Sequence, residues 1–438
     1  MKMAKVTVAS NYGLNMGSFD FSAIYYGWSY VQSGTLFRVD YGDGAIEEFR
    51  GTGFRYNTSG EPTAGTVTSY AAFYNGQRLF YVEGGAVAAT KIVTAARTYS
   101  TSDDLRVVAE VLKGNDTISG GNYADVLYGF DGNDFVAGNG GNDTLYGHAG
   151  NDTIHGGSEG DYINGGTGVD SASYAGSNRN VIASLSNPNI NTNDAIGDQY
   201  ASIENLIGTN YSDALYGNGS ANTLEGGSGN DTLIGGAGAD KLLGGAGIDT
   251  VSYANASAAV TAKLLYASTN TGDALGDTYS SVENIIGSIY ADKLYGSDGA
   301  NNITGGSGND GLVGNGGNDV LFGGQGADHL YGSVGADTFV FKAANESIGS
   351  AYDTIFDFLT SEQDKIDLST IDANISASGN QAFSFLGTAA FTGIAGELRY
   401  DKLSSDTYIY ADVNGDKLAD LKIRLDDAVT LTDGYFVL

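Results

Sequence analysis

The chain contains no cysteine, only two prolines and only three histidines among its 438 residues. The absence of cysteine excludes disulfides, thiolate metal ligands and a cysteine nucleophile, and it neither requires nor excludes an oxidising compartment. None of the histidines (His148, His155 and His329) is followed by glutamate, so the H-E-x-x-H motif of zinc proteases is absent. Each takes a variable position of the repeat described below, which favours a solvated turn position over a ligand or a base.

Long apolar runs and basic residues are also scarce. No segment approaches the ~20 apolar residues that span a membrane, and the N-terminus lacks an apolar run of secretory length. We therefore expect neither an integral membrane protein nor a cleaved N-terminal signal. The chain has 21 basic and 52 acidic residues, and its net charge of −31 argues against binding to the phosphates of nucleic acids.

Such an excess of negative charge repels itself in a compact fold unless cations neutralise it. The chain is nevertheless 41% hydrophobic and has 29 tyrosines, which is enough apolar surface to fold. Glycine is abundant, at 67 residues, and together with the scarcity of proline it indicates many tight turns joined by short strands. We therefore expect a folded protein whose acidic groups bind cations.

Aspartates recur on a nine-residue grid in three runs, and a large apolar residue follows most of them two positions later. Glycines precede them, as in residues 138–145, which read G-N-G-G-N-D-T-L. The repeat is G-G-x-G-x-D-x-U-x, where U is a large apolar residue. Asn222 and Asn301 take the aspartate position at two points of the grid. The sixteen grid aspartates are Asp116, Asp125, Asp134, Asp143, Asp152, Asp161, Asp170, Asp213, Asp231, Asp240, Asp249, Asp292, Asp310, Asp319, Asp328 and Asp337.

The chemistry of the repeat points to calcium. Glycine turns expose backbone carbonyls, and each aspartate adds a carboxylate at the end of its turn; such hard oxygen ligands are those that calcium prefers. The D-x-U step predicts a very short strand with U pointing inward, and two nonapeptides form one coil of eighteen residues. Asp116 then stacks over Asp134, and one ion is shared by stacked turns. One repeat cannot bury its apolar residue alone, so the array folds cooperatively as a solenoid.

Residues 113–340 resemble the RTX (repeats-in-toxin) β-roll, whose calcium-binding nonapeptide they match. The resemblance implies an all-β fold, a right-handed parallel β-roll solenoid in which the grid aspartates hold on the order of ten calcium ions. Residues 170–248 and 249–327 are tandem copies, 79 residues apart and without insertion. Within them, segments 171–207 and 250–286 alternate apolar residues but lack glycine turns; they either continue the roll as calcium-poor rungs or loop out of it.

The chain from about residue 335 onwards resembles the region that follows the β-roll in serralysin-type secreted metalloproteases. The matching motifs are 335–341 (G-A-D-T-F-V-F), 353–358 (D-T-I-F-D-F), 364–369 (D-K-I-D-L-S) and 412–416 (D-V-N-G-D). In that family the region caps the roll and carries an uncleaved signal for the type I secretion machinery. The resemblance therefore implies a secreted protein, extracellular or bound at the cell surface, with residues 341–438 as a β-rich secretion and cap region.

An EF-hand-like pattern lies in the same region. Asp412, Asn414, Asp416 and Asp420 sit at positions 1, 3, 5 and 9 of such a loop, but Ile423 stands where the loop requires glutamate. The favoured interpretation is an ordinary acidic turn.

Residues 1–100 match no family that their motifs identify, and they are predicted to form a small β-rich unit of unknown role. Two hairpins are expected, with turns at Asp43-Gly44 and at Asn75-Gly76 between strand-like segments. Residues 101–112 are predicted to form a helix with Leu105, Val108 and Leu112 on one face. The helix runs into the first repeat, and we expect it to cap the open end of the solenoid.

Two classes of function remain. The favoured one is a non-catalytic, calcium-loaded extracellular protein that acts at the cell surface, in a matrix or on a partner, with cell-surface polysaccharide among the candidate partners. Residues 1–100 contain no histidine or cysteine, which excludes His-based triads and cysteine nucleophiles there, and no catalytic residue is assigned. The alternative is a small secreted polysaccharide-degrading enzyme with its active site in that unit. The hairpin acids Asp40, Asp43, Glu47 and Glu48 could supply its carboxylate pair.

The two classes predict different surfaces. Exposed tyrosines and Trp28 in a groove with two carboxylates would favour the enzyme, because glycosidases use a carboxylate pair. A closed N-terminal unit would favour the non-catalytic protein.

Overall fold

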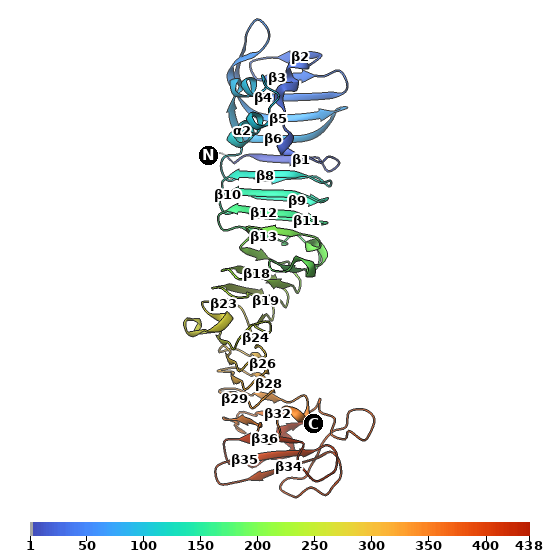
Figure 1. Cartoon of the computed structure of the whole chain (residues 1–438), viewed down its shortest axis with the longest axis vertical. Coiled ribbons are helices and arrows are strands. Elements are labelled where there is room, and N and C mark those ends of the chain that lie inside the picture. Colours follow the sequence, from blue (N-terminus) through green and yellow to red (C-terminus); the bar gives the residue numbers. More distant parts are fainter. Residues whose placement is uncertain (1–2) are drawn as a thin grey trace. The chain divides into compact units, whose positions relative to one another are not determined.

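The computed structural model describes residues 3–438, which divide into two compact units, Met1–Asp213 and Ala214–Leu438. Both units consist mainly of short strands (Figure 1). None of the helices within residues 3–438 is long and apolar enough to cross a membrane.

The first unit opens with an antiparallel sheet. Its strands are β1 (Lys5–Val8), β2 (Ser29–Gln32), β3 (Leu36–Asp40), β4 (Ala45–Tyr56), β5 (Pro62–Tyr74) and β6 (Gln77–Ala88). Their order in the sheet is β2-β3-β4-β5-β6-β1. Both predicted hairpins form, since Asp40 pairs with Ile46 and Tyr74 pairs with Gln77. Asn75 and Gly76 have φ of 47° and 78°, as this tight turn requires.

Helices pack against this sheet over an aromatic core. They are α1 (Ala89–Ala95), α2 (Thr101–Val111) and the 3-10 helices η1 (Met16–Ser18) and η2 (Phe21–Tyr26). The rings of Phe49 and Tyr70 stack at 4.6 Å in the core. Helix α2 forms where the sequence predicts it, and Val108 and Leu112 are buried, but Asp104 and Val107 complete its inner face in place of Leu105.

Strand β1 joins this sheet to the roll. It pairs antiparallel with β6 and parallel with β7 (Thr117–Ser119), the first strand of the roll. The segment that follows β1 lies along the next strand of the roll, which begins at Val126, and the amide of Val126 donates to the carbonyl of Leu14 at 2.7 Å. The expected capping helix leads directly into the first repeat, while the hydrogen-bonding edge of the first coil is covered by β1 and by residues 14–16.

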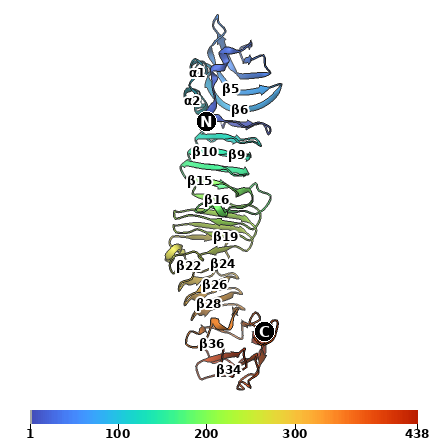
Figure 2. The ribbon, with the colours of Figure 1, turned by 45° about the vertical axis from the view of Figure 1, so that its right-hand side comes forward.

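The roll of the first unit has two parallel sheets whose rungs stack one upon the next (Figure 2). Its further strands are β8 (Val126–Asp131), β9 (Phe135–Gly140), β10 (Thr144–Ala149), β11 (Thr153–Ser158), β12 (Tyr162–Thr167), β13 (Ser171–Ser173), β14 (Ile182–Ser184), β15 (Gln199–Ala201) and β16 (Asn205–Ile207). One sheet runs β7-β9-β11-β13-β16 and the other β8-β10-β12-β15. Leu145 pairs with Leu127 and with Ile163, which confirms the eighteen-residue coil, and all three are fully buried. The strands are longer than the D-x-U step predicts, because pairing continues past the glycine to His148.

The second unit continues in the same manner. Its roll strands are β17 (Ala214–Tyr216), β18 (Thr223–Ser228), β19 (Thr232–Ile234), β20 (Lys241–Ala246), β21 (Thr250–Ser252), β22 (Thr261–Lys263), β23 (Thr278–Ser280), β24 (Asn284–Ile286), β25 (Lys293–Tyr295), β26 (Asn302–Ser307), β27 (Gly311–Val313), β28 (Val320–Gln325), β29 (His329–Tyr331) and β30 (Thr338–Val340). Leu294 pairs with Leu312, again eighteen residues later.

The segments without glycine turns remain in the roll and also change its sheets. In the second unit, β21 pairs with β19 and β24, so one sheet continues. Strand β23 pairs with β20 and ends its sheet, while β22 pairs with β25 and begins a new one. The coil at this point therefore has three strands. Between β22 and β23, the short 3-10 helices η5 (Ala267–Thr269) and η6 (Gly272–Ala274) form an excursion, so both expectations for these segments hold in part.

Parallel pairing extends past residue 340. Strands β31 (Asp353–Ile355) and β32 (Lys365–Asp367) pair with β29 and β30, beyond the 3-10 helix η7 (Ala344–Glu346). The chain then forms β33 (Ser384–Phe385), β34 (Glu397–Lys402), β35 (Thr407–Asp412), β36 (Leu421–Leu425), the 3-10 helix η8 (Asp433–Tyr435) and β37 (Phe436–Val437). Strands β34, β35 and β36 are antiparallel, and β36 and β37 return to pair with β31 and β32. The C-terminal region is thus β-rich, as expected.

Candidate metal centres

The grid aspartates form hydrogen-bonded ladders inside the turns of the roll. Within the regular runs, the backbone amide of an aspartate donates to the Oδ1 atom of the aspartate one coil later, as Asp143 does to Asp161 at 2.8 Å. In the first unit the same bond joins Asp116 to Asp134, Asp134 to Asp152, Asp152 to Asp170 and Asp125 to Asp143. In the second it joins Asn222 to Asp240, Asp231 to Asp249, Asp292 to Asp310, Asp310 to Asp328, Asn301 to Asp319 and Asp319 to Asp337. The predicted stacking of residues eighteen apart is confirmed.

The second carboxylate oxygen, Oδ2, is buried at most of these positions, and no hydrogen-bond donor of residues 3–438 reaches it. This holds for Asp116, Asp134, Asp143, Asp152, Asp161, Asp170, Asp240, Asp249, Asp310, Asp319, Asp328 and Asp337. A buried carboxylate oxygen without a donor is costly, because the charge loses its hydration and gains nothing in exchange. A repeated defect of this kind in one structural position indicates a missing positive partner.

A glycine in the preceding turn leaves room for that partner. A Cβ atom added to Gly138 would collide with the Oδ2 of Asp143 and with the carbonyl oxygen of Gly156. The two oxygens therefore converge on the space that glycine keeps open. The same arrangement recurs at Gly129 with Asp134 and Gly147, at Gly147 with Asp152 and Gly165, at Gly305 with Asp310 and Gly323, and at Gly314 with Asp319 and Gly332.

These donor sets fit calcium. Within residues 3–438, no three side chains of Asp, Glu, His or Cys gather as metal ligands, and the oxygens that converge at these turns are one from a carboxylate and one from a backbone carbonyl. Carbonyl and carboxylate oxygens suit calcium, whereas zinc prefers nitrogen and sulfur. The Oδ2 of the grid aspartates and the facing glycine carbonyls are the atoms that would hold the ion.

The electrostatics of the turns agree with this assignment. Desolvation by burial raises the pKa of Asp134 and Asp143 to about 7 and that of Asp161 to about 8, although backbone amides donating to Oδ1 oppose the shift. Neighbouring carboxylates of the ladder raise these pKa values further. A divalent cation beside Oδ2 would favour the ionised form instead.

Three grid aspartates differ from the rest. The Oδ2 atoms of Asp125, Asp213 and Asp292 accept hydrogen bonds from backbone amides of their own turns, those of Gly121, Thr209 and Ser288. At Asn301 the side-chain amide donates to the carbonyl of Glu283 at 2.6 Å, so this position satisfies itself without an ion. The structure thus separates grid positions whose side chains already have hydrogen-bond partners from those whose Oδ2 has none within the described residues, and the repeat pattern did not predict this difference.

The ladders also contain members that the nine-residue grid misses. Where a run of repeats stops, the carboxylate on the next coil comes from further along the chain than eighteen residues. The backbone amides of the last aspartates then donate as follows: Asp161 to Asp198, Asp170 to Glu204, Asp240 to Asp277, Asp249 to Glu283, Asp328 to Asp353 and Asp337 to Asp364. A local signal exists, because Asp353 and Asp364 each begin a D-x-I step and Glu204 begins E-N-L. The irregular spacing hides it from a search on period.

At Asp198 and Asp277 the second carboxylate oxygen accepts a hydrogen bond from a tyrosine, whereas at most grid positions it has no donor in the part of the chain that the structure describes. The hydroxyl of Tyr174 donates to the Oδ2 of Asp198 at 2.7 Å, and that of Tyr253 donates to Asp277 at 2.8 Å. Each of these tyrosines also contacts a second tyrosine hydroxyl, Tyr200 or Tyr279. Each tandem copy therefore has its own buried polar network of the same kind, at a rung where the carboxylate already has a donor.

The other predicted polar sites are resolved by their contacts. In the EF-hand-like loop, Asp412 accepts from the amide of Lys417 at 2.9 Å and Asp420 accepts from that of Val413 at 2.9 Å, which favours the acidic turn. His148 has φ of 74°, at the turn position that glycine usually takes. The expectation of turn positions is wrong for the other two histidines. His155 is at the ninth position of its repeat and lies in strand β11 against Phe135. His329 stands between the aspartate and the apolar residue of its repeat and lies in strand β29 against Phe356, exposed to solvent.

Comparison with known families agrees with this geometry. The RTX calcium-binding nonapeptide repeat (4 copies) matches residues 113–145, 137–172, 202–233, 216–251 and 278–312. The region described as peptidase M10 serralysin C terminal matches residues 298–437. The chain is an RTX repeat protein with a serralysin-type C-terminal region. RTX repeats bind calcium, and this pair of regions indicates a type I secreted, extracellular protein.

Solved structures that are similar to this chain include two subunits of one epimerase and a lipase. The AlgE6R2 subunit of the Azotobacter vinelandii mannuronan C5-epimerase is 30% identical, covers 36% of this chain and 92% of its own, and has a TM-score of 0.28. The AlgE6R3 subunit of that epimerase is 32% identical, with 34% and 78% coverage and a TM-score of 0.26. The extracellular lipase LipA from Serratia marcescens is 13% identical, with 90% and 80% coverage and a TM-score of 0.21. No curated protein matches the chain in sequence.

Proposed function

We propose that this chain is a non-catalytic extracellular binding protein whose RTX roll folds when it meets calcium after export, taking up on the order of ten ions. The observation that carries the proposal is the row of buried Oδ2 atoms without donors; those of Asp134, Asp143, Asp152, Asp310 and Asp319 converge with a glycine carbonyl. The grid aspartates named above are the proposed ligands. Export by an uncleaved C-terminal signal is part of the proposal, supported by the serralysin C-terminal match.

The energetics explain why calcium and folding are coupled. Each buried aspartate with a raised pKa must either hold a proton or remain charged without solvent, at a cost on the order of a few kcal/mol. A chain with net charge −31 cannot absorb this cost many times over, since native stability is only about 5–15 kcal/mol. Calcium removes the cost at each site, so its binding free energy becomes folding free energy.

Circular dichroism of the full chain, with EDTA and then with calcium added in the millimolar range, tests the proposal. We expect β-structure to increase greatly with calcium, because extracellular calcium modules bind at roughly 10⁻⁴–10⁻³ M. Magnesium at the same concentrations serves as the control, since it retains its water ligands and demands a stricter geometry. Identical spectra in EDTA and calcium would overturn the proposal.

Three of the four hairpin acids named for the enzymatic alternative have partners of their own. The hairpin acids are engaged separately: Asp40 and Asp43 accept amides of their own turn at 2.9 and 3.0 Å, and Glu48 pairs with Arg50. The Oε2 atom of Glu47 is buried. The concave surface beside the exposed tyrosines of this unit has one acidic residue, Glu61, along its wall. Because a glycosidase uses two carboxyl groups across one bond, this arrangement favours binding over cleavage.

A further inference from the structure

Two adjoining pockets open on the N-terminal sheet of the first unit. One, of about 280 Å³, is lined by Ser22, Tyr25, Tyr26, Glu61, Arg97 and Tyr99. The other, of about 150 Å³, is lined by Tyr25, Tyr30, Gln32, Ser59 and Glu61. They share Tyr25 and Glu61 and therefore form one groove, which we call the tyrosine groove. Its total size lies within the ~300–1,000 Å³ that is usual for ligand sites.

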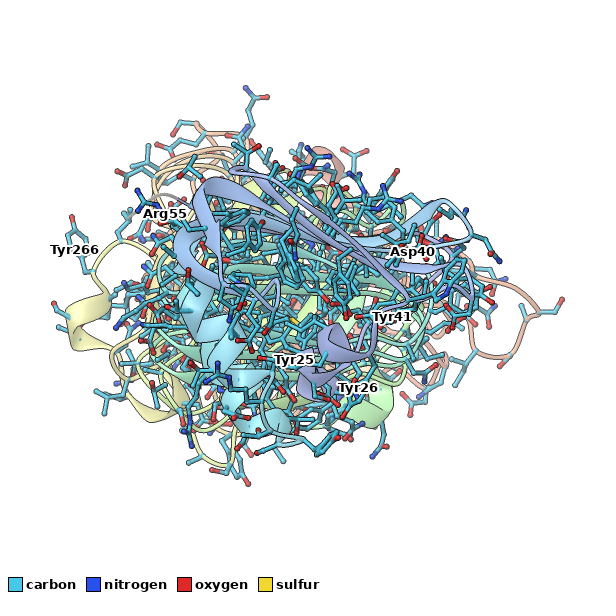
Figure 3. The ribbon with its side chains drawn as sticks, turned by 90° about the horizontal axis from the view of Figure 1, so that it is seen from above. Tyr25, Tyr26, Asp40, Tyr41, Arg55 and Tyr266 are labelled. Carbon is cyan, nitrogen blue, oxygen red and sulfur yellow. The ribbon has the colours of Figure 1, made fainter. Side chains whose placement is uncertain are left out.

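Aromatic side chains of the groove face solvent. Tyr26 is 64% exposed and Tyr99 is 75% exposed, and their hydroxyl groups contact each other. Trp28, two residues from both Tyr26 and Tyr30, is 80% exposed. Figure 3 shows Tyr25 and Tyr26 near each other, and both belong to η2. Exposed aromatic side chains gathered in this way mark interaction sites, because each combines an apolar face with a polar edge.

Hydrogen bonds hold the groove in shape before any ligand arrives. The hydroxyl of Tyr25 donates to Glu61 at 2.8 Å, and the side-chain amide of Asn57 donates to its other oxygen at 2.9 Å. Arg97 lies 3.4 Å from the same carboxylate. The hydroxyl of Tyr30 donates to the carbonyl of Ile24 at 3.0 Å. A preorganised site loses little conformational entropy on binding, which raises its affinity.

The chemistry of the wall selects the ligand. Hydroxyl groups predominate, and the two charges, Glu61 and Arg97, neutralise each other. The whole chain has a net charge of −31, which disfavours polyanions such as uronate chains and acidic lipid surfaces. The core of a protein interface would be drier and poorer in charge than this wall. Rings with one apolar face and many hydroxyl groups match these surfaces best.

We propose that the tyrosine groove binds a neutral oligosaccharide, with sugar rings stacked on Tyr26 and Tyr99 and with hydroxyl groups hydrogen-bonded to Glu61, Arg97 and Gln32. The inference rests on the proposed function, since it names the class of partner that the extracellular protein binds. It adds a site in the part of the chain that lies outside both matched family regions.

The single tryptophan of the chain provides the readout. Trp28 fluorescence of the calcium-loaded full chain is titrated with cellohexaose, maltohexaose and xylohexaose, and with a hexameric uronate as the charged contrast. We expect at least one neutral hexaose to bind saturably and more tightly than the uronate. The double variant Y26A/Y99A is expected to lose roughly tenfold or more in affinity, as is usual for aromatic anchors. E61Q is expected to weaken binding while keeping the stacking rings.

The matched control is Tyr266→Ala in the second unit, a tyrosine that is also 72% exposed but does not line the groove. Its affinity should equal that of the wild type. No binding of any neutral hexaose, a preference for the uronate, or equal affinity in Y26A/Y99A would overturn the inference. Circular dichroism of the same samples separates this result from the proposed function. Calcium-dependent folding without sugar binding would refute the groove alone, and calcium-independent folding would refute the proposed function alone.

Discussion

The backbone amide of Asp143 donates a 2.8 Å hydrogen bond to the Oδ1 of Asp161, while the Oδ2 of Asp143 itself has no donor within residues 3–438. One aspartate thus serves two purposes. Its backbone and Oδ1 fix the register of stacked coils, and its Oδ2 is the atom that we propose binds an ion. Substitutions can separate these purposes, because their effects on calcium demand and on stability differ.

Asp143→Ala should raise the calcium concentration at the folding midpoint more than Asp116→Ala does. Asp143 lies between Asp125 and Asp161 in its ladder, whereas Asp116 has only the amide of Ala4 on its outer side, at 2.6 Å. Calcium titrations followed by the far-ultraviolet circular dichroism of β-structure measure the midpoints. Equal shifts for the two variants would refute the sharing of ions between stacked turns.

Asn301→Asp should lower the calcium requirement. The present amide donates to the carbonyl of Glu283 at 2.6 Å, and a carboxylate there would lose this bond but add a charged ligand. We expect a variant that is less stable in EDTA and folds at lower calcium. Asn222→Asp, the equivalent position in the other tandem copy, should behave alike. A higher midpoint for both variants would contradict the assignment of this position as a weak site.

Tyr174→Phe should destabilise the first unit by about 1–3 kcal/mol, the usual cost of leaving a buried acceptor without its donor. The lost bond is the 2.7 Å contact to the Oδ2 of Asp198, and both residues are buried. Urea unfolding at saturating calcium measures the loss. The exposed Tyr266→Phe is the control, with no expected change, and a neutral result for Tyr174→Phe would show that the network is dispensable.

Glu47→Gln should remove part of the pH dependence of stability. Burial raises the pKa of Glu47 to about 7, against an ordinary value of 4.5. Between these values the folded state holds a proton that the unfolded state has lost, so stability falls as pH rises from about 4.5 to 7 and is level above. The fall is at most about 3 kcal/mol. Thermal unfolding in calcium from pH 4.5 to 8 should show a flatter profile for Glu47→Gln than for the wild type, and an identical profile would contradict the prediction.

Deleting roughly the last 60 residues should abolish secretion by a cell with a type I exporter, because the serralysin-type region is the proposed signal. Immunoblots of medium and cells measure the distribution. A double substitution of the exposed Leu403 and Leu418 serves as a control that leaves the region in place. Normal export of the truncated chain, or a processed N-terminus on the secreted protein, would contradict the proposed route.

The regular part of the ladder follows from the sequence alone, because a fixed period of nine places Asp134 under Asp116 whatever the remaining side chains do. The members at Asp198 and Asp353 do not follow, since segments of irregular length separate them from Asp161 and Asp328. Backbone pairing, and not spacing, decides which carboxylate comes next.

In the N-terminal unit, still fewer of the long-range contacts can be predicted from the sequence. Its hairpins are predictable from local turn residues such as Asn75-Gly76. The pairing of β1 with β7 joins residues 112 positions apart, and only four residues of β1 carry the signal. The tyrosine groove combines Tyr25, Glu61 and Tyr99, which the sequence gives no reason to bring together.

The ladder bonds all run in one direction, from an amide to a carboxylate that lies later in the chain. For these amides, a coil therefore finds its carboxylate acceptor on the coil that follows it. For a chain that leaves the cell from its C-terminal end, each emerging coil meets a finished template, and we expect the roll to grow as a ratchet toward the N-terminus. If a closed coil cannot re-enter the exporter, assembly outside the cell would itself pull the remaining chain across.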